Sequence, residues 1–77
     1  MPVLHVRVHY YDENRNLVSL YGGNPITIRI NNNNHNHIIQ QLRNTLSMEY
    51  NNLFARQAMV TNLMLNSQNG SCDIYFN

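Results

Sequence analysis

The side chains of this sequence that could bind a metal ion are its histidines. His35 and His37 flank one asparagine, and His5 and His9 lie four residues apart in an alternating stretch. Two histidines at i and i+2 point the same way only on a strand, and at a helix start they diverge by about 200°. On a strand, His5 and His9 would share a face but lie about 13 Å apart. Zinc needs three or four convergent ligands, so we predict no metal and no cofactor.

The spacing of the serine, cysteine and acidic residues in the sequence does not indicate a catalytic site. A nucleophile needs a base and an orienting group beside it, and no motif supplies them next to the serines or the single cysteine. Asp12 and Glu13 fall in a polar stretch typical of a solvated turn. The glycine pair in "YGGNP" precedes a strand pattern, whereas a phosphate-binding loop leads into a helix. We therefore predict no catalytic residues and no enzyme activity.

The most informative side chains form a row on the first predicted strand. Residues 3–11 alternate, and the polar face carries His5, Arg7, His9 and Tyr11, with Arg29 beside them if the strands pair. Such a face can bind single-stranded nucleic acid through phosphate contacts and base stacking. It can equally bind a protein, or simply face water. A net charge of only +1 makes nucleic acid the less favoured partner.

Three strand patterns position this row. Residues 3–11 and 17–21 read as a hairpin around the polar turn "DENRN". "GGNP" at 22–25 interrupts the second strand, because glycine permits positive φ and proline lacks a backbone donor. Residues 26–30 alternate again, as a third strand or as the second one continued beyond a bulge.

An amphipathic helix is predicted over residues 35–50. Five apolar side chains fall within an arc of about 120°: Ile38, Leu42, Leu46, Tyr50 and Leu53. Asn33 or Asn34 is the expected N-cap, because an asparagine oxygen can accept an unpaired amide hydrogen of the first turn.

The C-terminal third is less regular. Residues 54–65 fit short strands or a second short helix, residues 66–71 fit a turn around Asn69-Gly70, and residues 72–77 fit a last strand. The sequence thus predicts one α+β domain spanning residues 1–77. Its order is β-β(-β)-α-β-β, with a small antiparallel or mixed sheet and one amphipathic helix packed on one face.

Length and composition limit the protein class. A chain of 77 residues buries only about 60% of the surface its unfolded form exposes. With Cys72 as its only cysteine, the chain cannot form an internal disulfide, which favours an intracellular, non-secreted protein. No apolar stretch is long enough to span a membrane. The chain contains 15 asparagines and no lysine, since all five basic residues are arginines.

The order of elements resembles the ubiquitin-like β-grasp. The matching stretches are "VLHVRVHYY", "LVSLY" and "ITIRI" for the hairpin region, "HIIQQLRNTLSMEY" for the helix and "CDIYF" for the last strand. The resemblance implies a protein-binding module. The chain ends in "YFN" without the diglycine of conjugated members, so conjugation to other proteins is not implied.

We therefore expect a small non-enzymatic protein-interaction module that binds another protein and self-associates. The alternative is a nucleic-acid binder that uses the His5–Tyr11 row and Arg29. Dimerisation is expected because a small core gains stability when a second copy covers exposed apolar surface. Met48 is the predicted contact, because it falls on the polar side of the expected helix.

Overall fold

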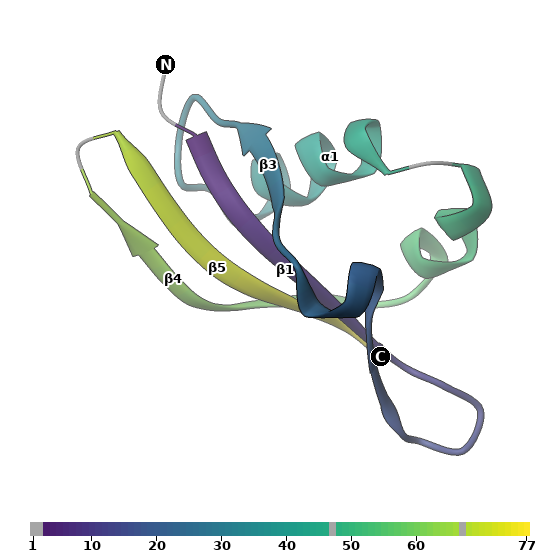
Figure 1. Cartoon of the computed structure of the whole chain (residues 1–77). Coiled ribbons are helices and arrows are strands. Elements are labelled where there is room, and N and C mark those ends of the chain that lie inside the picture. Colours follow the sequence, from purple (N-terminus) through teal and green to yellow (C-terminus); the bar gives the residue numbers. More distant parts are fainter. Residues whose placement is uncertain (1–2, 47, 67) are drawn as a thin grey trace.

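The computed structural model describes residues 3–46, 48–66 and 68–77, with only the backbone of Met48 and Glu49. It has an α+β fold in which one helix packs on one face of a mixed sheet (Figure 1). The predicted fold class and element order are confirmed. The strands are β1 (Val3–Tyr11), β2 (Leu17–Ser19), β3 (Ile26–Arg29), β4 (Ala58–Leu65) and β5 (Asn69–Phe76). The helical segments are η1 (Leu20–Gly23), α1 (His35–Thr45) and η2 (Met48–Ala55), of which η1 and η2 are 3₁₀.

The first and last strands lie side by side at the centre of the sheet. The strand order is β2-β1-β5-β4, and β3 pairs with β1 as well. β1 and β5 are parallel, from Val3 opposite Asn69 to Tyr10 opposite Phe76. The other pairings are antiparallel, with β3 beside the first half of β1 and β2 beside its end. The strand predicted over residues 17–21 ends at Ser19, because Tyr21 has φ 53° and belongs to η1. This turn separates β2 from β3, and Gly22 and Gly23 in it have positive φ, as the sequence predicts.

The hydrophobic core lies between the sheet and the helical segments. Alternation places one side of β1 and one side of β5 against α1. The buried apolar side chains are Leu4, Val6, Val8, Leu20, Ile28, Ile30, Ile38, Leu42, Leu46, Leu53, Cys72, Ile74 and Phe76. The opposite side of the sheet is therefore the one that meets solvent. We call it the outer face.

Helix α1 begins where the sequence predicts. The Asn34 side chain caps it, because its oxygen accepts from the backbone N–H groups of Asn36 at 2.8 Å and His37 at 3.4 Å. His37 Nε2 accepts from the Asn31 N–H at 3.2 Å and closes the connecting loop. Among the described residues, no group of three potential metal ligands comes together.

The predicted extent of the helix, residues 35–50, is wrong. Leu46 has an extended backbone with ψ 147° and ends α1, and the chain restarts as η2. The break changes the direction of the chain, so that Leu53 is buried and the Phe54 ring packs edge-on against Phe76, 5.7 Å between centroids. Burial of these side chains outweighs the continuous helical pattern. Met48 thus begins η2 instead of lying on the back of α1, and its side chain is outside the described part of the chain.

The ambiguous C-terminal third forms a hairpin. Residues 58–65 are a strand, and 54–55 belong to η2. Asn69 and Gly70 were expected in the turn but begin β5. Gly70 is needed for space rather than for a positive φ. A Cβ atom there would lie 2.6 Å from the Met64 carbonyl oxygen and 2.7 Å from a Leu65 methyl group.

Candidate interaction face

The outer face brings together the residues predicted from the β1 pattern. His5, Arg7, His9 and Tyr11 alternate along one side of β1, and Arg29 lies opposite Val3 on β3, at the His5 end of the row. His5 Nδ1 is 3.1 Å from Thr27 Oγ1, its partner across the β1–β3 pair. All five residues that the sequence pattern singled out therefore lie on a common face of the sheet.

An unpredicted residue, Asp73, lies at the centre of this face. Asp73 is opposite Arg7 in the parallel β1–β5 pair, and it is only 6% exposed. Arg7 contacts both of its carboxylate oxygens, with Nε 2.8 Å from Oδ1 and Nη2 3.2 Å from Oδ2. Two-point contacts of this kind fix the orientation of both groups. Arg7 is thus paired within the sheet.

A bulge in β4 completes the environment of Asp73. The β4–β5 register shifts between Thr61 and Met64, and Asn62 has φ 53°. This backbone turns the Asn62 side chain onto the outer face, where its Nδ2 donates to Asp73 Oδ2 at 3.1 Å. Thr61 Oγ1 donates to the Asp73 carbonyl oxygen at 3.3 Å. A bulge commonly redirects a side chain in this way.

These contacts keep Asp73 ionised. Burial alone raises the pKa of its carboxyl, but hydrogen bonds from Asn62 and His9 and the charge and hydrogen bond of Arg7 outweigh burial. The pKa of Asp73 therefore lies below its ordinary value of 3.8. The result is a neutralised, fully hydrogen-bonded centre in the outer face.

His9 links this centre to Ser19. Because an ionised carboxylate only accepts, His9 Nε2 donates to Asp73 Oδ1 at 3.2 Å. The Ser19 hydroxyl lies 2.7 Å from His9 Nδ1, which accepts from it when the imidazole is neutral. The His9 ring stacks on Tyr75 with 4.7 Å between centroids. A hydroxyl, an imidazole and a carboxylate in series are also the components of a nucleophilic triad.

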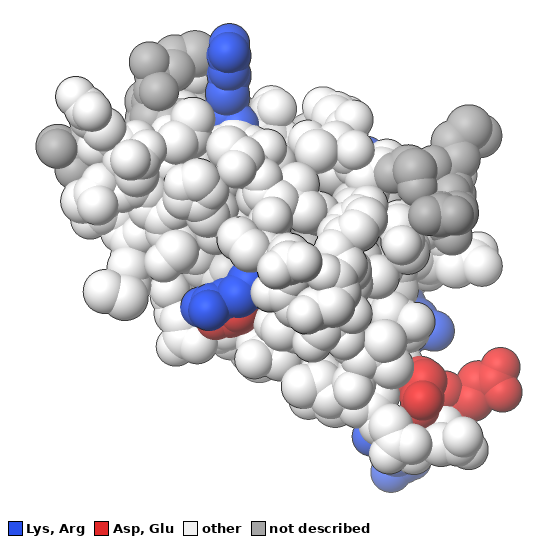
Figure 2. Space-filling view, viewed as in Figure 1, with Lys and Arg blue, Asp and Glu red and all other residues white. Residues whose placement is uncertain are grey.

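A shallow hollow of about 370 Å³ lies beside His9 on the same face. It is lined by Tyr11, Leu17, Met59, Thr61, Tyr75 and Asn77, and we call it the tyrosine hollow. Tyr11 is 38% exposed, Leu17 50% and Met59 58%. Tyrosine and methionine are enriched at protein interfaces. Most of the surface visible in Figure 2 is uncharged, with the charged side chains few and scattered.

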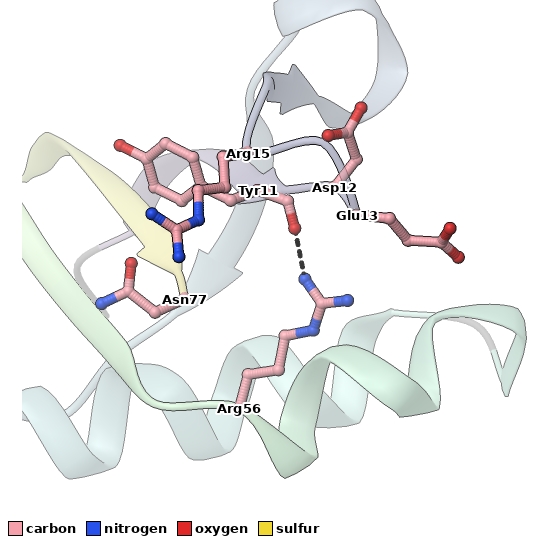
Figure 3. A pocket seen from close by; sticks show the side chains of 6 residues that line it. All are labelled: Tyr11, Asp12, Glu13, Arg15, Arg56 and Asn77. Atoms are coloured by element: carbon pink, nitrogen blue, oxygen red, sulfur yellow. Dashed lines mark hydrogen bonds between the residues drawn. The ribbon is translucent and has the colours of Figure 1, made fainter.

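A second hollow, of about 510 Å³, lies at the end of the β1–β2 hairpin (Figure 3). Arg56 reaches across it from before β4, and its Nη1 donates to the Tyr11 carbonyl oxygen at 2.6 Å. Asp12 and Glu13 carry the carboxylates of its rim, and Arg15 adds a second guanidinium. Because its rim carries both carboxylates and guanidinium groups, this hollow favours neither anions nor cations, and no particular ligand is indicated. The Arg56 hydrogen bond ties the end of β1 to the segment before β4.

Cys72 lies on the opposite, core side of β5 and is fully buried. Burial, together with the charge of Asp73, raises the pKa of its thiol to about 11. The thiol is therefore protonated and unreactive at neutral pH, because the thiolate is the nucleophilic form. Its role is packing in the core.

Sequence reasoning missed Ser19, Asn62, Asp73 and Tyr75. One signal was present, because "CDIYF" alternates and puts Asp73 and Tyr75 on the face opposite Cys72, Ile74 and Phe76. Comparison of the chain with protein-family models, curated proteins and solved structures gave no match. Among the described residues, no helix is long and apolar enough to cross a membrane.

Proposed function

We propose that this protein is a small, non-enzymatic protein-interaction module that binds another protein through the outer face and also self-associates. The observation that carries the proposal is the tyrosine hollow, where exposed Tyr11, Leu17 and Met59 surround a concave surface. Apolar and aromatic side chains in a concave site with a polar surround are typical of binding hot spots. The adjoining Arg7–Asp73 pair holds the strands beneath this site in a fixed arrangement.

The strand order supports the ubiquitin-like β-grasp as the fold family of this module. A parallel β1–β5 pair at the centre, a hairpin on one side of it and one helix on one face agree with the resemblance in the sequence. An intracellular location is part of the proposal, because a lone buried cysteine suits a reducing compartment. Fold alone does not determine function, so the surface chemistry carries the argument.

Nucleic-acid binding is the weaker alternative. The row needs arginines that can reach phosphates, yet Arg7 already contacts both oxygens of Asp73. Arg29 lies at one corner of the face, and the net charge of the chain is only +1. Each phosphate contact contributes through counterion release. Arg29 alone would release few counterions and would therefore add little affinity for nucleic acid.

The test is purification of the tagged protein from its native cell, followed by mass spectrometry and nucleic-acid quantification of the eluate. Wild type and an Asn44→Asp control on the exposed side of α1 should retain the same protein partner. Leu17→Asp should reduce its recovery about tenfold or more, because a charge in the hollow has to be desolvated on binding. Equal recovery with Leu17→Asp, or an eluate that contains nucleic acid instead of protein, would contradict the proposal.

The Ser19–His9–Asp73 series yields a second prediction. A triad carboxylate stabilises the imidazolium that forms during attack, but the charge of Asp73 is already compensated by Arg7. We expect Ser19 to remain unlabelled by a fluorophosphonate probe under conditions that fully label a serine hydrolase. Labelling that disappears in Ser19→Ala but persists in Ser71→Ala would show instead that the chain is an enzyme.

A further inference from the structure

Strand β4 has one edge without a strand partner. Among the described strands it pairs only with β5, and it lies at the margin of the sheet (Figure 1). Its sequence, "AMVTNLML", contains no charged residue and no proline. Met64 on this strand is 69% exposed and Leu65 44%. Proteins usually protect such edges with charges, prolines or bulges, and here only the bulge is present.

The bulge changes which side chains face outward. Met59 lies opposite Tyr75 and Met64 lies opposite Ser71, and both partners are on the outer face of β5. In a regular strand, two residues five positions apart would point to opposite faces. The extra residue between Thr61 and Met64 therefore puts both methionines on the outer face.

The free edge can be identified from two hydrogen bonds. The Asn77 N–H donates to the Gln57 carbonyl oxygen at 2.9 Å, so Gln57 faces β5. Because the backbone groups of an antiparallel strand alternate between its two edges, Ala58 and Val60 direct theirs to the free side.

The same reasoning applies beyond the bulge. The Asn66 N–H donates to the Asn69 carbonyl oxygen at 3.1 Å, so Asn66 faces β5. Leu63 and Leu65 then direct their N–H and C=O groups to the free side. The free edge thus presents backbone groups from two residues on each side of the bulge.

These positions are self-complementary about a two-fold axis. If two β4 strands lie antiparallel with their bulges opposite each other, Val60 faces Leu63 of the second copy, and Ala58 faces its Leu65. Both members of each pair direct backbone groups to the free edge, so each pair can exchange two hydrogen bonds. Met59 meets Met64 of the second copy on the outer face.

Charge and twist select the second copy over another strand. An uncharged strand brings no like charges together when it pairs with itself. A bulge accentuates the local twist and discourages pairing with a regular edge. A second β4 has the same twist and the same extra residue at the axis, so it removes this mismatch.

We propose that the protein forms a two-fold dimer in which the β4 edges of two copies pair and join their sheets into one. The inference deepens the proposed self-association by naming the partner as a second copy and the contact as β4. Both helical layers then lie on the same side of the joined sheet. The two tyrosine hollows share the opposite side, so the dimer is bivalent.

Sedimentation velocity of two double variants tests the pairing. The chain is 9.0 kDa, and wild type at micromolar concentration should sediment with twice that mass. M59K/M64K and M59E/M64E should each be monomers, because like charges then meet across the axis, and an equimolar mixture should recover the dimer. Leu17→Lys, at a half-exposed site off β4, should leave the dimer intact. A monomeric wild type, or a dimer that both double variants retain, overturns the proposal.

Amide hydrogen exchange provides a second readout. The N–H groups of Val60 and Leu63 should be protected in the wild-type dimer and exchange at least tenfold faster in M59K/M64K, while Ile74 stays protected in both. Rapid exchange of Val60 and Leu63 in a dimer would place the contact elsewhere. Met64 does not line the tyrosine hollow, so partner recovery by Met64→Lys separates the two proposals: loss of dimerisation with retained recovery leaves outer-face binding in place.

Discussion

Replacing Leu42 by alanine will lower the free energy of unfolding by about 2–5 kcal/mol. Leu42 is fully buried near the centre of α1 and belongs to the core beneath β1 and β5. Its removal takes apolar atoms from the core and leaves a cavity that the short helix can fill only in part. The total stability of small domains is about 5–15 kcal/mol, so this single change removes a large share of it.

Urea denaturation followed by circular dichroism measures the effect. Gln40→Ala is the matched control, because Gln40 is exposed on the same helix and its loss should change stability by less than about 0.5 kcal/mol. The slope of the transition should stay constant while the midpoint falls. An unchanged midpoint for Leu42→Ala would mean that α1 packs on the sheet through another face.

The second large effect is a loss of folding stability at acid pH that arises from Asp73. Because its folded pKa lies below the ordinary 3.8, the ionised carboxylate stabilises the folded state above that value. This stabilisation is lost as pH falls through the folded pKa. Asp73→Ala should cost about 1–3 kcal/mol at neutral pH, because His9 and Asn62 lose a buried acceptor.

Urea midpoints measured between about pH 5 and pH 2 test whether stability falls as Asp73 becomes protonated. Wild type should lose stability over this interval more steeply than Asp73→Asn, and the two curves should converge at the acid end. Glu13→Gln, in the exposed hairpin turn, should follow wild type throughout. Parallel curves for wild type and Asp73→Asn would show that the carboxylate is not held by the contacts of the outer face.

Local patterns in the sequence were sufficient for the strands at residues 3–11 and 26–29 and for the composition of one face. The alternation of residues 3–11 correctly placed His5, Arg7, His9 and Tyr11 together, and asparagine chemistry limited the helix cap to Asn33 or Asn34, of which Asn34 is the cap. Both features depend on neighbours within a few residues. They could therefore be predicted without knowledge of the fold.

The features that sequence reasoning missed depend on distant partners. Arg7 and Asp73 are 66 residues apart, and only the parallel β1–β5 register brings them into contact. The break after Thr45 likewise depends on burial of Leu53 and on packing of Phe54 against Phe76 of β5, which the helical pattern of residues 35–50 does not reveal. The bulge at Asn62 has no local sequence signal of comparable strength.

The central β1–β5 pair also affects how the chain can fold during synthesis. Among the five strands of the sheet, β1 leaves the ribosome before the others, and the strand that completes the core beside it, Asn69–Phe76, follows all of them. Until then, Leu4, Val6 and Val8 have no β5 beside them, and only the hairpin and the helix can form. Folds dominated by such distant contacts form slowly, and their unfinished sheets tend to aggregate. We therefore expect the nascent chain to depend on chaperones until Phe76 has emerged.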